Sequence, residues 1–355
     1  MAPINTAPFV KIIPRVLAAL VCVALQYSGS ANAQMSAMGN SAHAAAAHVE
    51  SHAIPNVFSR TATVNGQKVF YREAGDTTAP TIVLLHGFPS SSHMFRDLIP
   101  RLADRFHVVA PDYVGFGHSA APTPSEFSYT FDNLAQTTQG LLDQIGVREA
   151  IFYMHDYGGP IGLRLAAAHP ERVKGLIVQN ANAYMEGVGK PVADVFLPLW
   201  KERNAETEAA ARGFLKAETT VFQYTAGARS AAALNPDAWT HDQALLDRKG
   251  NDAIQLALFV DYQKNVGLFD AWHSYLNKHQ PKTLIVWGKG DPLFVPAGAQ
   301  AYLNDLPKAE LVWLDGGHFA LEENSGAVAN HIKQFFHPMK PVAAAPLMPR
   351  QNNFF

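Results

Sequence analysis

Cysteine is nearly absent from this chain, which has a single one, Cys22, among its 355 residues. An internal disulfide is therefore excluded, and so is a cysteine-ligated metal site built from several thiolates. The chain also has no large excess of positive or negative charge, because it contains 28 Lys and Arg and 30 Asp and Glu. Without a basic run, the sequence offers no electrostatic footprint for nucleic acid. No internal repeat is visible, and no apolar run after residue 33 is long enough to span a bilayer.

The first 33 residues have the three parts of a secretory signal. Lys11 and Arg15 precede an apolar run from Val16 to Leu25, and Ala31-Asn32-Ala33 provides a small-residue cleavage site. A membrane anchor is the alternative, but the apolar run is short for a bilayer. We therefore expect a signal peptide over residues 1–33 and a periplasmic or secreted protein without stable membrane insertion. Cleavage after Ala33 would leave a mature chain that has no thiol.

Two further segments predict little ordered structure. Residues 34–56 are rich in Ala, Ser and His, and we expect a flexible lead-in there. His43, His48 and His52 could suggest metal capture, but no pattern of carboxylates accompanies them. Residues 338–355, with several prolines and an alanine run, predict a disordered tail.

Between these segments the pattern alternates between strands and helices. Ser59 to Val64 and Gln67 to Arg72 flank Asn65-Gly66, a pair typical of two-residue hairpin turns. Short, continuous apolar runs follow, as in parallel strands that are buried on both faces. These runs are 81–85, 107–110, 150–154, 173–178, 283–287 and 311–314, and helical patterns at 131–145, 160–168 and 327–336 lie among them. The order predicts an α/β fold with a mostly parallel sheet flanked by helices.

The alternation stops between two of the predicted strands. Residues 183–280 contain helix-like patterns at 206–219 and 251–262 and no clear buried strand. We therefore expect a core formed by residues 57–182 and 281–337, with 183–280 as an inserted helical cap. The cap would cover the carboxyl ends of the strands, where open α/β sheets bind their ligands.

The stretch Met154-His155-Asp156-Tyr157-Gly158-Gly159 lies between a predicted strand and a predicted helix. A sharp, glycine-flanked turn in that context is typical of a nucleophile elbow, which usually presents serine. Here the central residue is Asp156, so the covalent intermediate would be an alkyl ester. A cap for the following helix is the alternative role for Asp156.

Four more motifs follow predicted strands. They are His86-Gly87-Phe88-Pro89, Asp112 within residues 111–119, Trp287-Gly288-Lys289-Gly290-Asp291-Pro292, and Gly316-Gly317-His318-Phe319. With Asp156, this ordered set closely resembles the α/β-hydrolase superfamily over residues 57–337, because nucleophile, acid and histidine follow one another in that family's order. The resemblance implies an α/β-hydrolase fold with an inserted helical cap. Met154 departs from the family pattern, which usually has a small residue two positions before the nucleophile.

An aspartate at the elbow resembles the epoxide hydrolase and haloalkane dehalogenase branch. The resemblance implies that Asp156 attacks an electrophilic carbon and that His318 then activates water to hydrolyse the ester. Asp291 would orient His318, and the backbone N–H groups of Phe88 and Tyr157 would form the oxyanion hole. No metal or organic cofactor is implied, because the protein supplies the nucleophile, base and oxyanion donors.

Other roles for these residues remain open at this stage. Asp291 precedes a proline, which is a common turn signature, and His318 could be an ordinary loop histidine. The relay acid could instead follow the strand that begins at Val173, but Asn180 and Asn182 stand there and carry no charge. Asp112 resembles a structural turn residue of the family.

The leaving group separates the two enzyme classes. An epoxide needs an acid, and Tyr262, in Asp261-Tyr262-Gln263-Lys264-Asn265, resembles a cap tyrosine that serves as this acid in epoxide hydrolases. Tyr224 is the candidate for a second acid, and a packed aromatic is the alternative for both. Dehalogenases commonly have His-Gly-Asn and Asp-Trp motifs that bind the halide, whereas Phe88 and Tyr157 stand here.

We therefore expect a secreted hydrolase that opens epoxides to diols through an aspartyl ester. A haloalkane dehalogenase, another C–X or ester hydrolase, and a non-catalytic small-molecule binding protein are the alternatives. The expected partners are a small hydrophobic organic substrate and water. Four cap residues could line a hydrophobic pocket or only pack the cap: Phe196, Trp200, Phe259 and Phe269. The sequence gives no oligomeric state.

Overall fold

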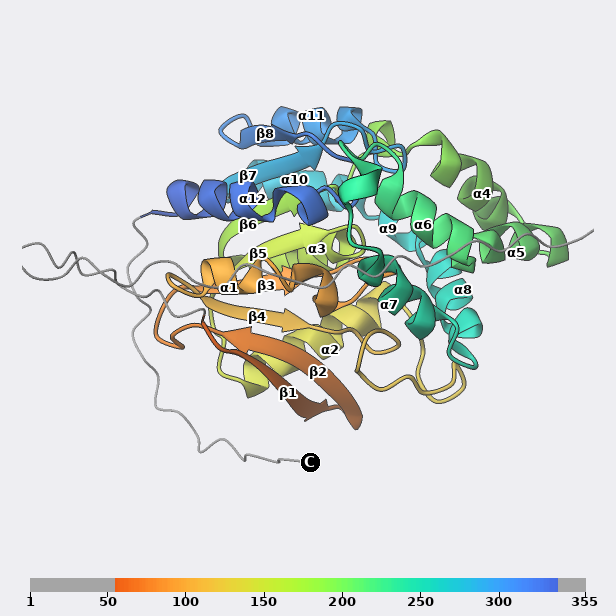
Figure 1. Ribbon diagram of the computed structural model, residues 1–355, viewed down its shortest axis with the longest axis horizontal. Helices are drawn as coiled ribbons and strands as arrows, with labels where there is room; N and C mark the ends of the chain where they lie inside the picture. The colour runs from red at the N-terminus through yellow and green to blue at the C-terminus, as the bar shows by residue number, and fades with distance from the viewer. Residues whose placement is uncertain (1–54, 338–355) are drawn as a thin grey trace, which may run out of the picture. The chain divides into compact units, whose positions relative to one another are not determined.

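The computed structural model describes residues 55–337. An eight-stranded sheet runs through this part, in the order β1-β2-β4-β3-β5-β6-β7-β8 (Figure 1). Its strands are β1 (Val57–Val64), β2 (Gln67–Ala74), β3 (Thr81–Leu85), β4 (His107–Pro111), β5 (Ala150–His155), β6 (Val173–Gln179), β7 (Thr283–Gly288) and β8 (Glu310–Leu314). β1 and β2 are antiparallel to their neighbours, and the other strands are parallel to one another.

The hairpin forms where the sequence predicts it. Asn65 and Gly66 both have positive φ, 49° and 79°, as the two-residue turn between paired strands requires. The signal peptide (1–33), most of the lead-in (34–56) and the tail (338–355) lie outside the described residues, so these predictions stay predictions.

Both faces of β3, β4, β5 and β7 are buried, which explains their largely apolar sequence, whereas the edge strand β8 is partly exposed. Side chains alternate along each strand: in β3, Val83 and Leu85 join one cluster of the core, whereas Ile82 and Leu84 join the other. The first cluster includes residues of helices α2 (Phe131–Gln144), α3 (Gly158–Ala168), α10 (Phe269–His279) and α11 (Pro296–Asp305). The second includes α1 (Ile99–Leu102), α12 (Leu321–Phe335) and the short helix η1 (Ser92–Phe95).

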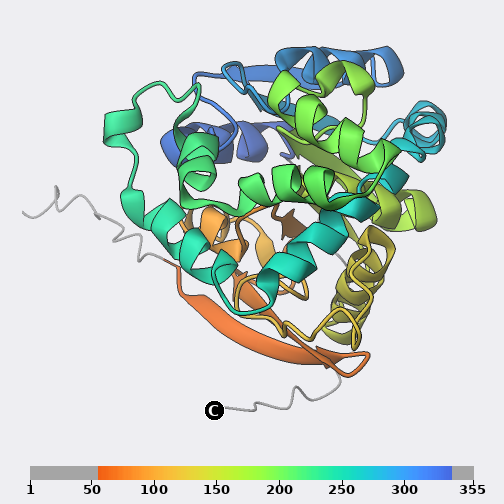
Figure 2. The same cartoon turned by 90° about the vertical axis from the view of Figure 1, so that its right-hand side faces the viewer.

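The segment between β6 and β7 contains helices and loops, as the sequence predicts. Its α-helices are α4 (Lys190–Lys201), α5 (Ala205–Arg212), α6 (Ala217–Thr225), α7 (Pro236–Leu246), α8 (Asn251–Asp261), α9 (Gln263–Val266) and α10. Helices α4 to α8 lie beyond the carboxyl ends of the parallel strands, and Figure 2 looks onto them from that side. Helix α10 contacts core helices α3 and α11, so the last part of the inserted segment packs against the core.

Two predicted helices differ in extent. The pattern at 206–219 predicts one helix, but α5 ends at Arg212, and Gly213–Leu215 forms a short 3₁₀ turn before α6 begins at Ala217. Helix α12 begins at Leu321, earlier than the predicted 327, and bends at Asn324, whose φ and ψ are not helical. The 3₁₀ turn Gly213–Leu215 is η4, and the other 3₁₀ turns are η2 (Pro170–Arg172), η3 (Met185–Gly187) and η5 (Ala231–Ala233). Among residues 55–337, no helix has the length and apolar character to cross a membrane.

Candidate active site

Asp156 occupies the sharp turn between β5 and α3. Its φ of 48° lies in the left-handed region, a strained conformation for a residue with a Cβ atom and one that clusters at functional sites. The turn fits only because glycines surround it: a Cβ on Gly158 would lie 2.2 Å from the Leu85 carbonyl oxygen, and one on Gly87 would lie 2.2 Å from the Asp156 Cβ. The backbone therefore has the geometry expected of an elbow.

Met154 is accommodated by a glycine elsewhere. Its side chain is fully buried, and a Cβ on Gly162, one turn along α3, would lie 2.5 Å from the Met154 sulfur. The absence of a side chain at Gly162 therefore leaves room for Met154, where related proteins usually have a small residue.

The Asp156 carboxylate is buried, and backbone donors hold one side of it. The N–H of Phe88 donates to Oδ1 at 2.6 Å, and the N–H of Tyr157 also hydrogen-bonds to the carboxylate. Burial raises the pKa of Asp156 to about 6, although His318 and the two N–H groups counteract part of that effect. The two predicted oxyanion donors therefore face the carboxylate, in position to bind an oxyanion that develops there.

His318 lies between the two carboxylates. Its Nδ1 is 2.8 Å from Asp291 Oδ2, and its Nε2 is 3.9 Å from Asp156 Oδ2. Burial acts to lower the pKa of His318, but the two carboxylates outweigh it, so the pKa is raised above its ordinary value. A neutral imidazole that donates Nδ1–H to Asp291 leaves Nε2 free to accept a proton beside Asp156.

Asp291 is fixed by donors on both oxygens. Its Oδ1 accepts from the N–H groups of Leu293 and Phe294 at 2.8 and 3.0 Å, and its Oδ2 accepts from the Asn180 side-chain amide at 2.8 Å. Asn180 in turn accepts the N–H of Gly288 at 3.0 Å. The sequence identifies Asn180 only as a residue that cannot be the relay acid. The structure shows it holding the relay acid, because β6 and β7 are neighbours in the sheet.

A cavity with about 50 Å³ of free space lies over Asp156 and His318, enough for a few water-sized molecules. Most of its lining residues are apolar or aromatic: Phe88, Tyr157, Val192, Phe196, Trp200, Phe214, Phe259, Tyr262, Leu293 and Phe294, with Gln223. No Lys or Arg is among the described lining residues. The aromatic cap residues of the prediction therefore belong to the cavity, except Phe269, which packs against Trp272 on α10.

Of the two candidate acids, Tyr262 is the one that lines the cavity with the catalytic residues. Its ring is nearly parallel to that of Trp200, with the two ring centroids 5.8 Å apart. Its hydroxyl makes no hydrogen bond within residues 55–337. Burial, followed by the charge of Asp156, raises the pKa of Tyr262, so its proton is retained at neutral pH. The Trp200 indole N–H is engaged, because it donates to the Phe259 carbonyl at 2.8 Å.

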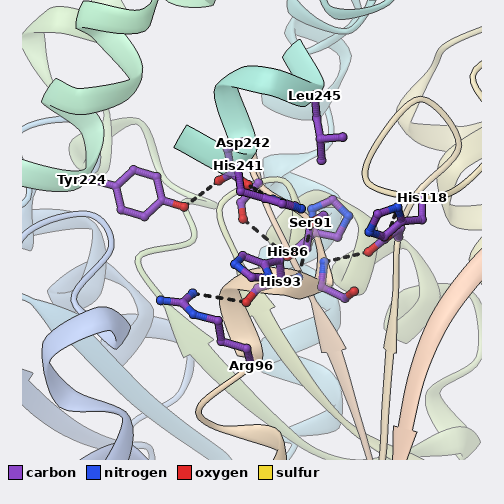
Figure 3. Close-up of polar contacts among 12 residues, drawn as sticks. His86, Ser91, His93, Arg96, His118, Tyr224, His241, Asp242 and Leu245 are labelled. Atoms are coloured by element: carbon purple, nitrogen blue, oxygen red, sulfur yellow. Dashed lines mark hydrogen bonds and ion pairs between the residues drawn. The ribbon is translucent and has the colours of Figure 1, made fainter. Parts of the chain in front are cut away.

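Tyr224 does not reach the cavity. Its hydroxyl donates to Asp242 of α7 at 2.6 Å, beside His241 (Figure 3), and its ring stacks on Phe319 at 3.9 Å. Successive residues of a helix point about 100° apart, so α6 turns Gln223 toward the cavity and Tyr224 away from it. The geometry therefore gives no support to Tyr224 as a second acid.

Asp112 has the structural role that the sequence predicts. Its oxygens accept from the N–H groups of Ser92 at 2.7 Å and His118 at 2.8 Å, which ties two loops together. No group of three or more potential His, Cys, Asp or Glu ligands in the described part of the chain could hold a metal ion. The histidines at 43, 48 and 52 lie outside that part.

Comparison with known proteins agrees with this geometry. Residues 80–325 match the α/β-hydrolase fold family. An uncharacterized hydrolase of Saccharomyces cerevisiae is 39% identical over 287 residues, which cover 79% of this chain and 97% of the yeast protein. A haloalkane dehalogenase of Bradyrhizobium diazoefficiens is 32% identical over 182 residues, 51% of this chain and 54% of that enzyme.

A solved structure gives the same fold. The haloalkane dehalogenase from Bradyrhizobium elkani has a TM-score of 0.66 and 23% identity, covering 79% of this chain and 97% of that chain. The chain therefore belongs to the α/β-hydrolase fold family.

Proposed function

We propose that this hydrolase opens small, neutral epoxides to diols through an ester on Asp156. The observation that carries the proposal is the unpartnered hydroxyl of Tyr262, a residue that lines the same cavity as Asp156 and His318. A phenol that keeps its proton at neutral pH is suited to protonate the oxygen of an opening epoxide. No Lys or Arg lines the cavity among the described residues, and His318 is already paired with Asp291. A substrate carboxylate would therefore be buried beside Asp156 without a cation of its own, which disfavours acidic substrates.

In the first step, Oδ2 of Asp156 forms a bond to one epoxide carbon as the ring C–O bond breaks. Tyr262 gives its proton to the leaving oxygen and becomes a phenolate. The product is a hydroxyalkyl ester. Its formation removes the negative charge of Asp156, one of the two charges that raise the pKa of His318. The lower pKa of His318 then favours the neutral imidazole, which is the form that can accept a proton from water.

In the second step, Nε2 of His318 takes a proton from water, and the hydroxide attacks the ester carbonyl. The N–H groups of Phe88 and Tyr157 stabilise the oxyanion that develops on the carboxyl group. Collapse releases the diol, whose oxygen takes the proton from His318. The proton left on Asp156 passes to the Tyr262 phenolate, and both groups return to their starting states.

A haloalkane dehalogenase is the second candidate, and the relative from Bradyrhizobium diazoefficiens favours it. The chemistry at Asp156, His318 and Asp291 would be the same, with halide as the leaving group. The cavity supports this less well, because Phe88 has no side-chain donor and the Trp200 N–H is already bonded to a carbonyl. A non-catalytic binding protein would have no need for the ordered pair His318 and Asp291.

We propose that the enzyme acts outside the cytoplasm, on the pattern of residues 1–33 alone. Sequencing the amino terminus of protein recovered from the periplasm or medium tests this. Mature protein beginning at Gln34 supports it, and retention of residues 1–33 in the cytoplasm contradicts it.

Tyr262→Phe should slow epoxide opening about 100-fold while ring stacking on Trp200 is preserved. The loss arises because the leaving oxygen receives no proton. The measurement is the single-turnover rate of ester formation with an epoxide and with a bromoalkane, and the bromoalkane rate should change much less. Tyr275→Phe, on α10 and outside the cavity, is the control. Equal losses with both substrates would contradict the acid role.

The rate of ester formation should fall as the pH drops through about 6, because the raised pKa of Asp156 determines when its carboxylate is lost. A protonated carboxyl cannot attack carbon, so the rate is high above this pH and declines below it. In His318→Gln the midpoint should move to higher pH, since His318 lowers the pKa of Asp156. Stopped-flow rates between pH 5 and 8 test both statements, and a flat profile would contradict them.

A further inference from the structure

Gln223 is a polar residue of the cavity that the steps above do not use. Its side chain is only 3% exposed, it lines the cavity with Asp156 and His318, and its Nε2 has no hydrogen-bond partner in the described chain. Buried amide groups in folded proteins are nearly always hydrogen-bonded, and an unpaired one costs stability. A bound molecule in the cavity would supply the missing partner.

The polar residues next to Gln223 on α6 are satisfied within the cap. The Thr220 hydroxyl donates to Gln243 at 2.7 Å, and the Tyr224 hydroxyl donates to Asp242 at 2.6 Å, both on α7. Among the described residues of α6, Gln223 alone lines the cavity, whose other lining residues are aromatic or aliphatic apart from the catalytic groups.

Helix α6 is also firmly placed against the catalytic loops. The turn that follows α6 lies close to the loop that carries Asp291, because a Cβ on Gly227 would lie 1.9 Å from the Gly290 carbonyl oxygen. A Cβ on Gly317, beside His318, would lie 2.0 Å from the Ala226 carbonyl. The end of α6, three residues beyond Gln223, is therefore packed directly against the loops that carry Asp291 and His318.

We propose that the Gln223 amide binds an oxygen of the substrate away from the reacting carbon. The preferred substrates are then small, neutral compounds that carry a hydroxyl, ether or carbonyl oxygen in addition to the leaving group. An entirely apolar substrate would displace water from the amide and leave it unpaired, whereas an oxygen-bearing one replaces that water. The inference rests on the proposed function only in requiring alkylation of Asp156, and it holds for either leaving group.

The test uses two pairs of substrates with equal numbers of heavy atoms: glycidol against 1,2-epoxybutane, and 3-bromopropan-1-ol against 1-bromobutane. In wild-type protein, kcat/KM should favour the hydroxyl-bearing member of each pair. Gln223→Met keeps the volume and removes the polar atoms, and it should reduce that preference about 10- to 100-fold. Gln300→Met, at an exposed position on α11, is the control and should leave the preference unchanged.

The outcomes separate this inference from the proposed function. An unchanged preference in Gln223→Met would overturn the inference, even where absolute rates fall. Turnover of the bromides alone would overturn epoxide opening, and the bromide pair would still decide the role of Gln223. If neither pair alkylates Asp156, the proposed function fails, and equilibrium binding of the four compounds to wild type and Gln223→Met decides the inference. Gln223→Met should unfold at no lower temperature than wild type, because it removes an unpaired buried amide.

Discussion

A His318→Gln variant should react once with an epoxide and then stop, with kcat lowered at least about 1,000-fold. Ester formation uses Asp156 and Tyr262, whereas ester hydrolysis needs Nε2 of His318 to take a proton from water. Glutamine cannot do this, so the ester should accumulate. Intact mass spectrometry should show the protein plus the whole mass of the epoxide, and peptide mapping should place the adduct on Asp156.

Two variants control this experiment. Asp156→Ala should form no adduct, and His169→Gln, at a half-exposed position outside the cavity, should turn over normally. An adduct of only the alkyl group after incubation with a bromoalkane, and none with epoxides, would move the assignment to a dehalogenase. Normal turnover by His318→Gln would contradict the role of His318 altogether.

Asp291→Asn should lower the rate of ester hydrolysis about 10,000-fold and affect ester formation far less. The Asp291 carboxylate accepts from Nδ1 of His318 and stabilises the imidazolium that forms when water is deprotonated. An amide at position 291 carries no charge and can present N–H to the ring, which favours the wrong tautomer. Asn180 also donates to the same oxygen, so an amide N–H turned toward Asn180 would lose that contact as well.

Rapid mixing with chemical quench separates the two steps in this variant. The ester should appear at a rate near that of wild type and then persist. Asp305→Asn, which alters a carboxylate bonded to Tyr184 outside the cavity, serves as the control. An equal loss in both steps would indicate that Asp291 supports the structure of the site rather than the base.

The sequence predicts the fold because local signals and long-range order agree. Parallel strands buried on both faces are largely apolar, as β3 and β5 are, and the Asn65-Gly66 turn fixes the opening hairpin. The catalytic residues follow strands in a recognisable order, so Asp156, Asp291 and His318 could be named before their distances were known.

Other features depend on contacts that no local pattern reveals. Which of two adjacent residues on α6 lines the cavity depends on how that helix packs against α7, so the sequence points to Tyr224, whereas the structure places Gln223 in the lining. The support of Asp291 by Asn180 follows from the pairing of β6 with β7, across 111 positions of sequence. No local pattern in the sequence distinguishes Gln223 from the other polar residues of the cap.

The measurement that tests the central claim most directly follows oxygen-18 from labelled water through a single turnover of wild-type enzyme in excess over substrate. In the ester mechanism, the oxygen bonded to the attacked carbon comes from Asp156, and the water oxygen remains on the carboxyl group. The account predicts an unlabelled diol and oxygen-18 in the peptide that contains Asp156. Label in the first diol formed, with none in that peptide, would show direct attack by water and contradict the covalent intermediate.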